Sequence, residues 1–423
     1  MRVEIVTAGS RGDVAPYTGL GQALRAAGHR VTVTTHGTFD ALVTGSGLAF
    51  RPLPGDPYAA QLTPGGRRLH RLGGGLRGTA EFVRQGRRYL DDLATGLVDV
   101  GADADVLLLA TTTAPLGYSA AQRHGIPSIG VFLQPVAPTG DFPPVLLGDR
   151  SFGSAGNRAL GRGAEAASAR AYDHSSRRLR HRLGLPPVPL AALLRQARRS
   201  GWPVLHGFSP SVLPRPADWR PGLEVVGYWW PATDPHWTPP PELTGFLDAG
   251  PPPVLITFGS MAVLDASLPT LIGTALRRAG VRAIVQAGWG GLRVSDDGVR
   301  PVSGDGVLAV GDVPHDWLLP RVAAVVHHAG AGTTAAGLRA GVPAVTVPLI
   351  ADQPFWAARL ARLGVATEPL PARRLTADRL ADAIRAVLDR PTYAERARHL
   401  AARIAADDGY AAVLRAVDRV TRR

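Results

Sequence analysis

Short, continuous runs of apolar residues alternate with helix-forming segments along the first half of the chain. The runs are Val3–Ala8, Arg30–Thr35, Asp105–Ala110 and Ser128–Phe132. Strands that are apolar at nearly every position are typical of parallel sheets covered by helices on both faces. The pattern therefore predicts an α/β fold with a doubly wound parallel sheet.

The same alternation begins again after a proline-rich stretch between Pro203 and Pro253. Such a stretch is stiff and extended, as a linker is. Further strands are then expected at residues 254–258, 282–286, 307–310, 323–327 and 344–347. We predict a first domain over residues 1–210, a linker over 211–240 and a second domain over 241–405. A final helix within 406–423 is predicted to pack back on the first domain.

The composition excludes several classes of protein. The 423 residues include no cysteine, which rules out disulfides and cysteine–zinc sites. No apolar run is long enough to span a bilayer. The segment Met1–Thr7 lacks the basic start and long apolar stretch of a signal peptide. We therefore expect a cytoplasmic location.

The net charge is +13, and every basic residue is an arginine. Arginines concentrate in residues 67–88 and 158–199. Solvated helix faces are the interpretation that we favour, and peripheral contact with a membrane or an anionic ligand is the alternative. Aromatic residues are too scattered to form a stacking platform for single strands, so no nucleic-acid partner is expected.

The most informative segment joins a predicted strand to a predicted helix in the second half. The apolar run Ala324–His327 is followed by His328, by Gly330 and Gly332, and then by Thr333. Glycine lets the backbone approach a ligand closely, and the amides at a helix start favour a dianion. Thr333 adds a hydroxyl donor, and His328 can donate a hydrogen bond to a phosphate oxygen. The segment predicts a phosphate-binding site.

Other interpretations of this segment stay open. The spacing Gly330-x-Gly332-x-x-Ala335 also matches a dinucleotide fingerprint, and Asp352 lies 20 residues beyond Gly332. An NAD(P)-dependent dehydrogenase is therefore an alternative, although the match does not lie at the first strand of the chain. A nucleotide-sugar epimerase, a basic binding module and a tight turn without a ligand are further alternatives.

Three neighbouring motifs resemble the nucleotide-sugar signature of the family 1 glycosyltransferases. They are residues 313–318, His327–Pro343 and Asp352–Trp356. Residues 9–16, 227–230 and 258–261 also match the sterol glucosyltransferase-like and bacterial natural-product branch of this family. The resemblance implies the GT-B fold. In that fold two Rossmann-like domains face each other across a cleft, with the acceptor in the first and the donor in the second.

The resemblance assigns phosphate-binding residues one by one. The diphosphate-binding histidine of the family falls on His328. The amides and the hydroxyl at the helix start fall on Gly330, Gly332 and Thr333. The phosphate-contacting serine falls on Ser260. These residues would hold the leaving group without a metal ion.

The sugar and the base have their own expected contacts. An acid–amide pair that holds sugar hydroxyls falls on Asp352 and Gln353. A helix cap is the alternative role for this pair, because Pro354 suits a first helical turn. The base is read by backbone near Val313.

The sequence leaves open whether the nucleotide of the donor is uridine diphosphate or thymidine diphosphate. The glutamate with which plant members contact the ribose is replaced by Ala336. Trp289 and Trp317 are alternatives for stacking on the base, and core packing is the role that we favour for both.

The acceptor must lose a proton as its oxygen attacks the anomeric carbon, and a positioned carboxylate or imidazole can take it. The resemblance assigns the role of this proton acceptor, the catalytic base, to Asp13, where plant members carry histidine. Ser10 is a weaker candidate for assisting this proton transfer. A cap on the helix expected to begin near Pro16 is the alternative role of Asp13.

A metal site is not expected. The string Asp103-Ala104-Asp105 matches the Asp-x-Asp motif of metal-dependent transferases, but it precedes a predicted strand, at the wrong edge of the sheet for a ligand. The expected function is an inverting, metal-independent transfer of a hexose from a UDP- or TDP-sugar, with no resident cofactor. The acceptor is expected to be a hydroxyl of an apolar small molecule such as a sterol, a polyketide or another secondary metabolite. The loop Gln134–Pro144 is a candidate wall of its pocket.

Overall fold

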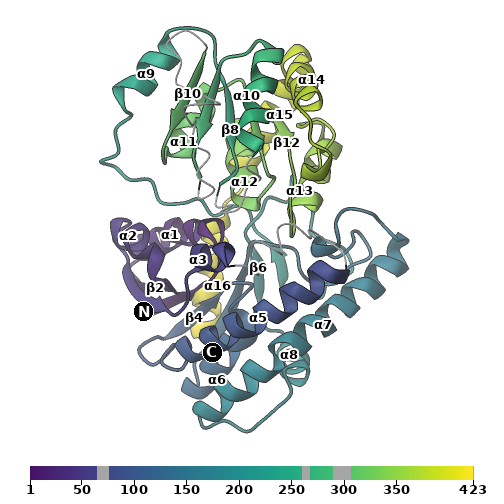
Figure 1. Ribbon diagram of the computed structural model, residues 1–423. Coiled ribbons are helices and arrows are strands. Elements are labelled where there is room, and N and C mark those ends of the chain that lie inside the picture. Colours follow the sequence, from purple (N-terminus) through teal and green to yellow (C-terminus); the bar gives the residue numbers. More distant parts are fainter. Residues whose placement is uncertain (64–75, 260–266, 289–305, 423) are drawn as a thin grey trace. The chain divides into compact units, whose positions relative to one another are not determined.

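The computed structural model describes residues 1–63, 76–259, 267–288 and 306–422. The chain divides into two compact units. One comprises Met1–Asp234 together with Asp407–Arg423, and the other comprises Pro235–Ala406. Each unit is built on a parallel sheet with helices on both faces (Figure 1).

The sheet of the first unit has seven strands in the order β3-β2-β1-β4-β5-β6-β7. Neighbouring strands pair in parallel throughout. The strands are β1 (Arg2–Val6), β2 (Arg30–His36), β3 (Ala49–Leu53), β4 (Val106–Leu109), β5 (Ser128–Phe132), β6 (Val204–His206) and β7 (Leu223–Val225). The helices of this unit are α1 (Arg11–Ala26), α2 (Asp40–Gly45), α3 (Pro57–Leu62), α5 (Leu76–Gly96), α6 (Ala114–His124), α7 (Gly153–Arg182), α8 (Leu190–Arg199) and α16 (Gly409–Thr421).

Alternate residues of the central strands supply two cores. On β4, Val106 and Leu108 belong to the core that α1 and α16 cover, whereas Leu107 and Leu109 belong to the core that α5 and α6 cover. All four side chains are fully buried. Successive side chains of a strand point to opposite faces of a sheet. The unbroken apolar run of the sequence is therefore the result of helices on both faces.

The sheet of the second unit has five parallel strands in the order β10-β9-β8-β11-β12. They are β8 (Val254–Thr257), β9 (Ala283–Gln286), β10 (Val307–Val310), β11 (Ala324–His327) and β12 (Ala344–Thr346). The helices are α9 (Pro241–Asp248), α10 (Leu268–Ala279), α11 (His315–Leu318), α12 (Ala331–Ala340), α13 (Gln353–Leu363), α14 (Ala377–Asp389) and α15 (Pro391–Ala405). Apolar residues of α10 and α14 close the core on one face of this sheet.

The proline-rich stretch is partly built into the first unit. Residues up to Asp234 belong to that unit, and Leu223–Val225 forms its edge strand β7. Three strands escaped the sequence analysis, namely β3, β6 and β7. They are short or interrupted by proline, so no long apolar run marks them.

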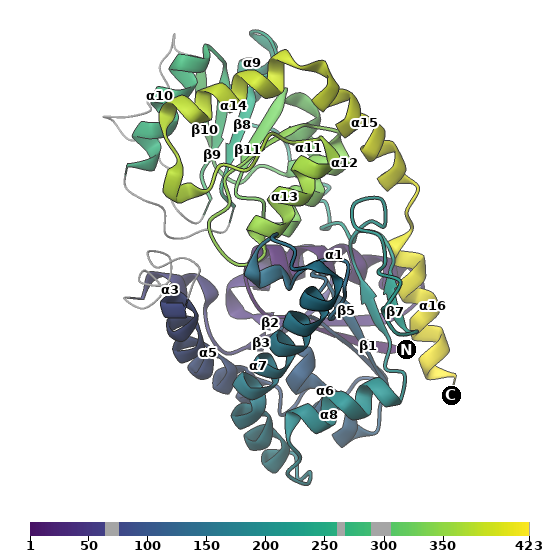
Figure 2. The same ribbon diagram turned by 90° about the vertical axis from the view of Figure 1, so that its right-hand side faces the viewer.

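The last helix belongs to the first unit. The indole N–H of Trp229 donates to the carbonyl of Gly409 at 3.1 Å, and the Trp230 amide donates to the Tyr410 hydroxyl at 2.9 Å. Val413 and Val417 enter the core on the α1 side of the first sheet. Helix α16 thus lies against that sheet (Figure 2), and the chain passes between the two units twice.

Candidate active site

Each sheet has a switch point at which the strand order reverses. In the first sheet it lies between β1 and β4, and in the second between β8 and β11. Ligands of open parallel sheets bind outside the carboxyl ends of the strands at such a point. Asp13 follows β1 and His328 follows β11. The predicted catalytic base, Asp13, and the residue predicted to bind the diphosphate, His328, therefore each lie at the switch point of their own unit.

The connection from β11 to α12 is a tight, buried turn. Ala329 has a φ of 63°, in the left-handed region that non-glycine residues rarely adopt. Its N–H donates to Nδ1 of His327 at 3.1 Å. Burial lowers the pKa of His327 to about 3, so this imidazole is neutral and carries its hydrogen on Nε2. His327 thus braces the turn, a role that the sequence analysis did not assign.

The His328 imidazole is buried beside this turn. It is 8% exposed, and its Nδ1 atom has no partner among the described residues. Burial, followed by the nearby His315, lowers the pKa of His328 to about 4, so the ring is neutral at pH 7. A Cβ atom at Gly330 would lie 2.3 Å from Nε2, and one at Gly259 would lie 3.0 Å from Cε1. Glycine at both positions lets the backbone close around the ring.

The start of α12 adds backbone donors next to His328. Gly330 is the N-cap residue, and its carbonyl accepts from the Thr334 amide at 2.9 Å. The amides of Gly332 and Thr333 lie in the first turn, where a helix offers no internal acceptor. Thr334 is also buried, and its Oγ1 has no partner in the part of the chain that the structure describes. This set of donors at the positive end of a helix fits an anion.

The segment around Val313 is fixed by a residue that the sequence analysis missed. Gln286, the last residue of β9, donates from Nε2 to the Val313 carbonyl at 3.0 Å. Its Oε1 lies 2.9 Å from Nε2 of His315. Val313 is therefore held at the carboxyl edge of the second sheet. The backbone contact with a nucleotide base stays a prediction.

Asp352 and Gln353 shape the turn that leads into α13. Oε1 of the buried Gln353 accepts from the amides of Leu349 and Ile350 at 2.8 and 3.0 Å. Asp352 is the N-cap residue, and its Oδ2 accepts from the indole N–H of Trp356 at 3.0 Å. Asp352 thus begins a helix and does not end a strand, unlike the ribose-binding acid of a dinucleotide fold. The sugar contact stays a prediction for both residues.

Two predicted residues, Ser260 and Trp289, lie outside the described residues. Trp317 lies 5.3 Å from Trp237, measured between ring centroids, and the guanidinium of Arg321 lies 4.2 Å above its ring. Arg321 precedes β11, at the amino edge of the sheet. Trp317 therefore contacts other side chains of the second unit, but it is only half-buried and is not a core residue.

In the first unit, helix α1 begins at Arg11 and contains Pro16, so the expected start near Pro16 is wrong. Ser10 is the N-cap residue and Asp13 occupies the third helical position. The backbone N–H and the hydroxyl of Ser10 donate to Oδ2 of Asp13 at 2.9 and 3.0 Å. A carboxylate that binds back to the N-cap amide is half of a capping box. Ser10 and Asp13 thus set the helix start, and Asp13 does take part in capping.

The second carboxylate oxygen of Asp13 has a different neighbour. Its Oδ1 accepts from Nε2 of Gln134 at 3.4 Å. Burial raises the pKa of Asp13 above its ordinary value, although hydrogen bonds from Ser10 and Gln134 oppose the rise. A raised pKa makes this carboxylate a stronger base than an exposed aspartate. Capping through Oδ2 and base catalysis through Oδ1 are therefore compatible.

Further polar groups gather at this edge. Thr111, after β4, donates to Oε1 of Gln134 at 2.9 Å. Nε2 of His36, the last residue of β2, lies 3.1 Å from the hydroxyl of Tyr89, on which Asp13 acts electrostatically. The sequence analysis assigned no role to Thr111, His36 or Tyr89. For Thr111 and His36 the signal that it passed over is a polar residue at the carboxyl end of an apolar run, whereas Tyr89 lies within α5 and carries no such signal.

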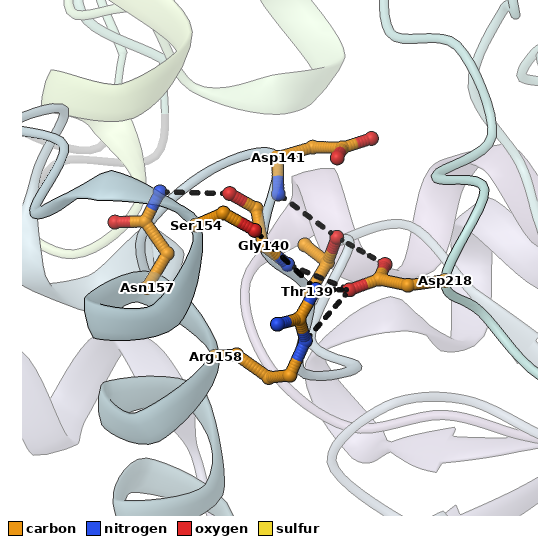
Figure 3. A network of polar contacts seen from close by, with 7 residues as sticks. All are labelled: Thr139, Gly140, Asp141, Ser154, Asn157, Arg158 and Asp218. Atoms are coloured by element: carbon orange, nitrogen blue, oxygen red, sulfur yellow. Dashed lines mark hydrogen bonds and ion pairs between the residues drawn. The ribbon is translucent and has the colours of Figure 1, made fainter.

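The proline-rich loop after β5 is anchored from two sides (Figure 3). Asp218 accepts from the Thr139 hydroxyl at 2.6 Å and from the Gly140 amide at 2.8 Å, and it pairs with Arg158 at 3.0 Å. Asn157 is 1% exposed and donates from Nδ2 to the Gly140 carbonyl at 3.1 Å. Helix α7 and the segment around Asp218 thus hold the loop in place. Its role as a wall of an acceptor pocket stays a prediction.

The two aspartates of the Asp-x-Asp string lie at the amino edge of the first sheet. Asp105 accepts from the Arg2 amide at 2.7 Å and pairs with the Arg2 guanidinium at 2.8 Å. Asp103 lies 3.5 Å from the guanidinium of Arg51. Within the described ranges no group of three or more metal-ligating side chains comes together. No helix in those ranges is both long and apolar enough to cross a membrane.

The second arginine-rich stretch forms most of α7. Arg177 pairs with Asp173 at 2.8 Å and Arg178 with Asp91 at 3.3 Å, all at partly exposed positions. Arg180 differs, because it is 4% exposed and bonds backbone and side chains nearby. The interpretation as a solvated face is therefore wrong for Arg180.

Two family models match separate parts of the chain. Residues 3–95 match the glycosyltransferase family 28 N-terminal domain. Residues 295–418 match the erythromycin biosynthesis protein CIII-like C-terminal domain. The first match covers the loop with Asp13, and the second covers the loop with His328.

Individual proteins are similar over nearly the whole chain. O-mycaminosyltylonolide 6-deoxyallosyltransferase of Streptomyces fradiae is 36% identical over 417 residues, which are 97% of this chain and 95% of that protein. Sterol 3-beta-glucosyltransferase UGT80A2 of Arabidopsis thaliana is 34% identical over 429 residues, which are 98% of this chain but 65% of that longer protein. The solved structure of spinosyn rhamnosyltransferase SpnG complexed with thymidine diphosphate aligns with a TM-score of 0.66 at 20% identity, covering 99% and 100% of the two chains.

These likenesses decide between the interpretations that the glycine loop left open. Identity above one third along almost the full length of a named glycosyltransferase shows a shared family, and the solved structure shows a shared fold. A dehydrogenase is therefore set aside. The chain belongs to the family 1 glycosyltransferases and has their GT-B fold.

Proposed function

We propose that this glycosyltransferase moves a hexose from a UDP- or TDP-sugar to a hydroxyl group of an apolar small molecule. The observation that carries the proposal is the buried imidazole of His328 beside the first-turn amides of α12. A diphosphate supplies the acceptors that these donors lack. The names of two relatives give the acceptor classes, a tylonolide in Streptomyces and a sterol in Arabidopsis, and a further neighbour was crystallised with thymidine diphosphate.

In this proposal the donor binds at the carboxyl edge of the second sheet. His328 and the amides of the first helical turn carry the charge of the diphosphate, so the reaction needs no metal ion and no resident cofactor. The nucleotide sugar is a co-substrate. The proposed donor contacts are His328, Gly330, Gly332, Thr333 and Ser260 for the phosphates, Val313 for the base, and Asp352 with Gln353 for the sugar.

The acceptor is proposed to bind at the carboxyl edge of the first sheet. Asp13 takes the proton of the attacking hydroxyl through Oδ1, while Ser10 holds Oδ2. The acceptor oxygen forms a bond to the anomeric carbon as the bond to the diphosphate breaks. A single displacement of this kind inverts the anomeric configuration.

A binding experiment tests the donor assignment. Thermal melts with UDP, TDP, UDP-glucose and NAD should show protection by at least one nucleoside diphosphate or its sugar, and none by NAD. Protection by NAD alone would refute the proposal.

A product experiment tests the transfer. The protein is incubated with UDP-glucose or TDP-sugars and a panel of sterols and polyketides in EDTA, and products are identified by mass spectrometry. Proton couplings of the product give its anomeric configuration. Conversion of the donor without an acceptor would indicate an epimerase, and loss of transfer in EDTA would contradict the metal-free reaction.

A further inference from the structure

Gln134 connects two strand ends of the first sheet to the carboxylate of Asp13. It follows β5, its Nε2 donates to Oδ1 of Asp13 at 3.4 Å, and its Oε1 accepts from Thr111 at 2.9 Å. A side-chain amide has one donating and one accepting end. Because Thr111 donates to the accepting end, the donating end faces Asp13.

The two oxygens of Asp13 are not equivalent. Oδ2 receives both the amide and the hydroxyl of Ser10 at 2.9 and 3.0 Å. Oδ1 has the longer contact with Gln134, beyond the usual range of about 2.7–3.2 Å for this kind of hydrogen bond. Catalytic hydrogen bonds are often long without substrate and tighten when it binds. Oδ1 is therefore the oxygen left to receive a proton.

The backbone of Gln134 is held in place on both sides. Leu133 before it is buried, and the loop after it is fixed to Asp218 and Asn157 (Figure 3). The direction of the amide is thus set by the fold and by Thr111 before any substrate binds.

We propose that Gln134 is a positioning residue for sugar transfer, which orients Oδ1 of Asp13 toward the acceptor hydroxyl while Thr111 fixes the direction of its amide. The inference rests on the proposed role of Asp13 as the base. A hydrogen bond to a carboxylate favours the ionised form, so loss of the Gln134 donor raises the pKa of Asp13 further.

The test compares the pH profile of kcat/KM in the parent protein and in Gln134→Ala. Gln122→Ala is the matched control, because Gln122 also bonds within the first unit, to Arg180. In Gln134→Ala the acid limb should move up by about half to one pH unit, and kcat should fall about tenfold. The KM for the nucleotide sugar should not change. Thr111→Val should shift the acid limb in the same direction by less.

Gln134→Glu keeps the shape of the side chain, so it tests the loss of the amide donor in case Gln134→Ala fails to fold. Its carboxylate next to Asp13 should raise the acid limb more than Gln134→Ala does. An acid limb that stays in place in both Gln134 variants, or that moves equally in the Gln122 control, overturns the proposal.

A second readout separates this inference from the proposed function. The carboxyl of Asp13 is followed by ¹³C NMR titration and assigned by its loss in Asp13→Asn. A parent protein that transfers no sugar contradicts the proposed function. The titration still decides the contact, because an unchanged Asp13 midpoint in both Gln134 variants refutes it and a raised midpoint supports it.

Discussion

His328 and Asp13, which follow the switch-point strands β11 and β1, differ in how their polar side chains are satisfied. At the edge of the second sheet, buried atoms of His328 and Thr334 have no partner among the described residues, and Ala329 holds a left-handed conformation. At the edge of the first sheet, Asp13 and Gln134 bond to each other and to their neighbours. A buried polar atom without a partner costs about 1–3 kcal/mol. From this difference we expect a ligand to complete the edge of the second sheet, whereas protein groups alone hold the Asp13 carboxylate in the first.

The largest effect on turnover is expected from a substitution of Asp13, at the carboxyl edge of the first sheet. Asp13→Asn keeps the size of the side chain and removes the base, so kcat should fall about 10³-fold. The affinity for UDP or TDP should stay unchanged, because the proposed donor site lies in the other unit. Steady-state kinetics and calorimetry measure the two quantities. Asp92→Asn, at an exposed position of α5, is the control. A collapse of donor affinity in Asp13→Asn would show that the carboxylate is not a base.

The next largest effect on turnover is expected from a substitution of His328, at the carboxyl edge of the second sheet. His328→Ala removes a donor to the diphosphate, and transfer should fall about 10²-fold or more. Nucleotide affinity should fall as well, in contrast to Asp13→Asn. His174→Ala, on the exposed side of α7, is the matched control. Unaltered turnover in His328→Ala would contradict the phosphate role.

Acid should destabilise the folded protein through the buried imidazole of His328. The pKa of His328 is lowered from 6.5 to about 4, so the unfolded chain takes up a proton that the folded protein does not. The free energy of unfolding should therefore fall as pH falls from about 6.5 toward 4. His328→Gln, which does not titrate, should lose about 1–2 kcal/mol less over this window. Urea titrations at pH 7.0 and 4.5 measure the loss, and equal losses in parent and variant would argue against a neutral buried ring.

The smallest effect concerns the strain stored at the second edge. Ala329→Gly relieves the left-handed conformation and should stabilise the protein by about 0.5–1 kcal/mol. Ala335→Gly, inside α12, is the control and should destabilise it by about 0.5–1 kcal/mol. Urea unfolding checks both values. Destabilisation by Ala329→Gly would mean that the methyl group contributes packing that outweighs the strain.

The sequence predicted those parts of the fold that long apolar runs mark. Strands such as Ser128–Phe132 and Val307–Val310 were predicted to the residue. The first is almost fully buried, whereas the second is a partly exposed strand at the edge of its sheet and is marked by its apolar run alone. β6 and β7 have three residues each among prolines, and no pattern that short predicts a strand. The start of α1 was predicted near Pro16, whereas the Ser10–Asp13 pair sets it at Arg11.

Within the candidate site, single motifs were predictable and partnerships were not. The glycines next to His328 and the acid in the first loop stand out in the sequence. The contact between Gln134 and Asp13 joins residues far apart in the chain, and so does the contact between His36 and Tyr89. Such pairs depend on which strands become neighbours in the sheet. No local pattern carries that information.

The return of the chain to the first unit has a consequence for its biosynthesis. The residues that complete the α1 side of the first sheet, Val413 and Val417 among them, are made after the second unit. During translation this apolar face stays open while the entire second unit is being synthesised. The first unit therefore completes this face of its core only after the whole second unit has been synthesised.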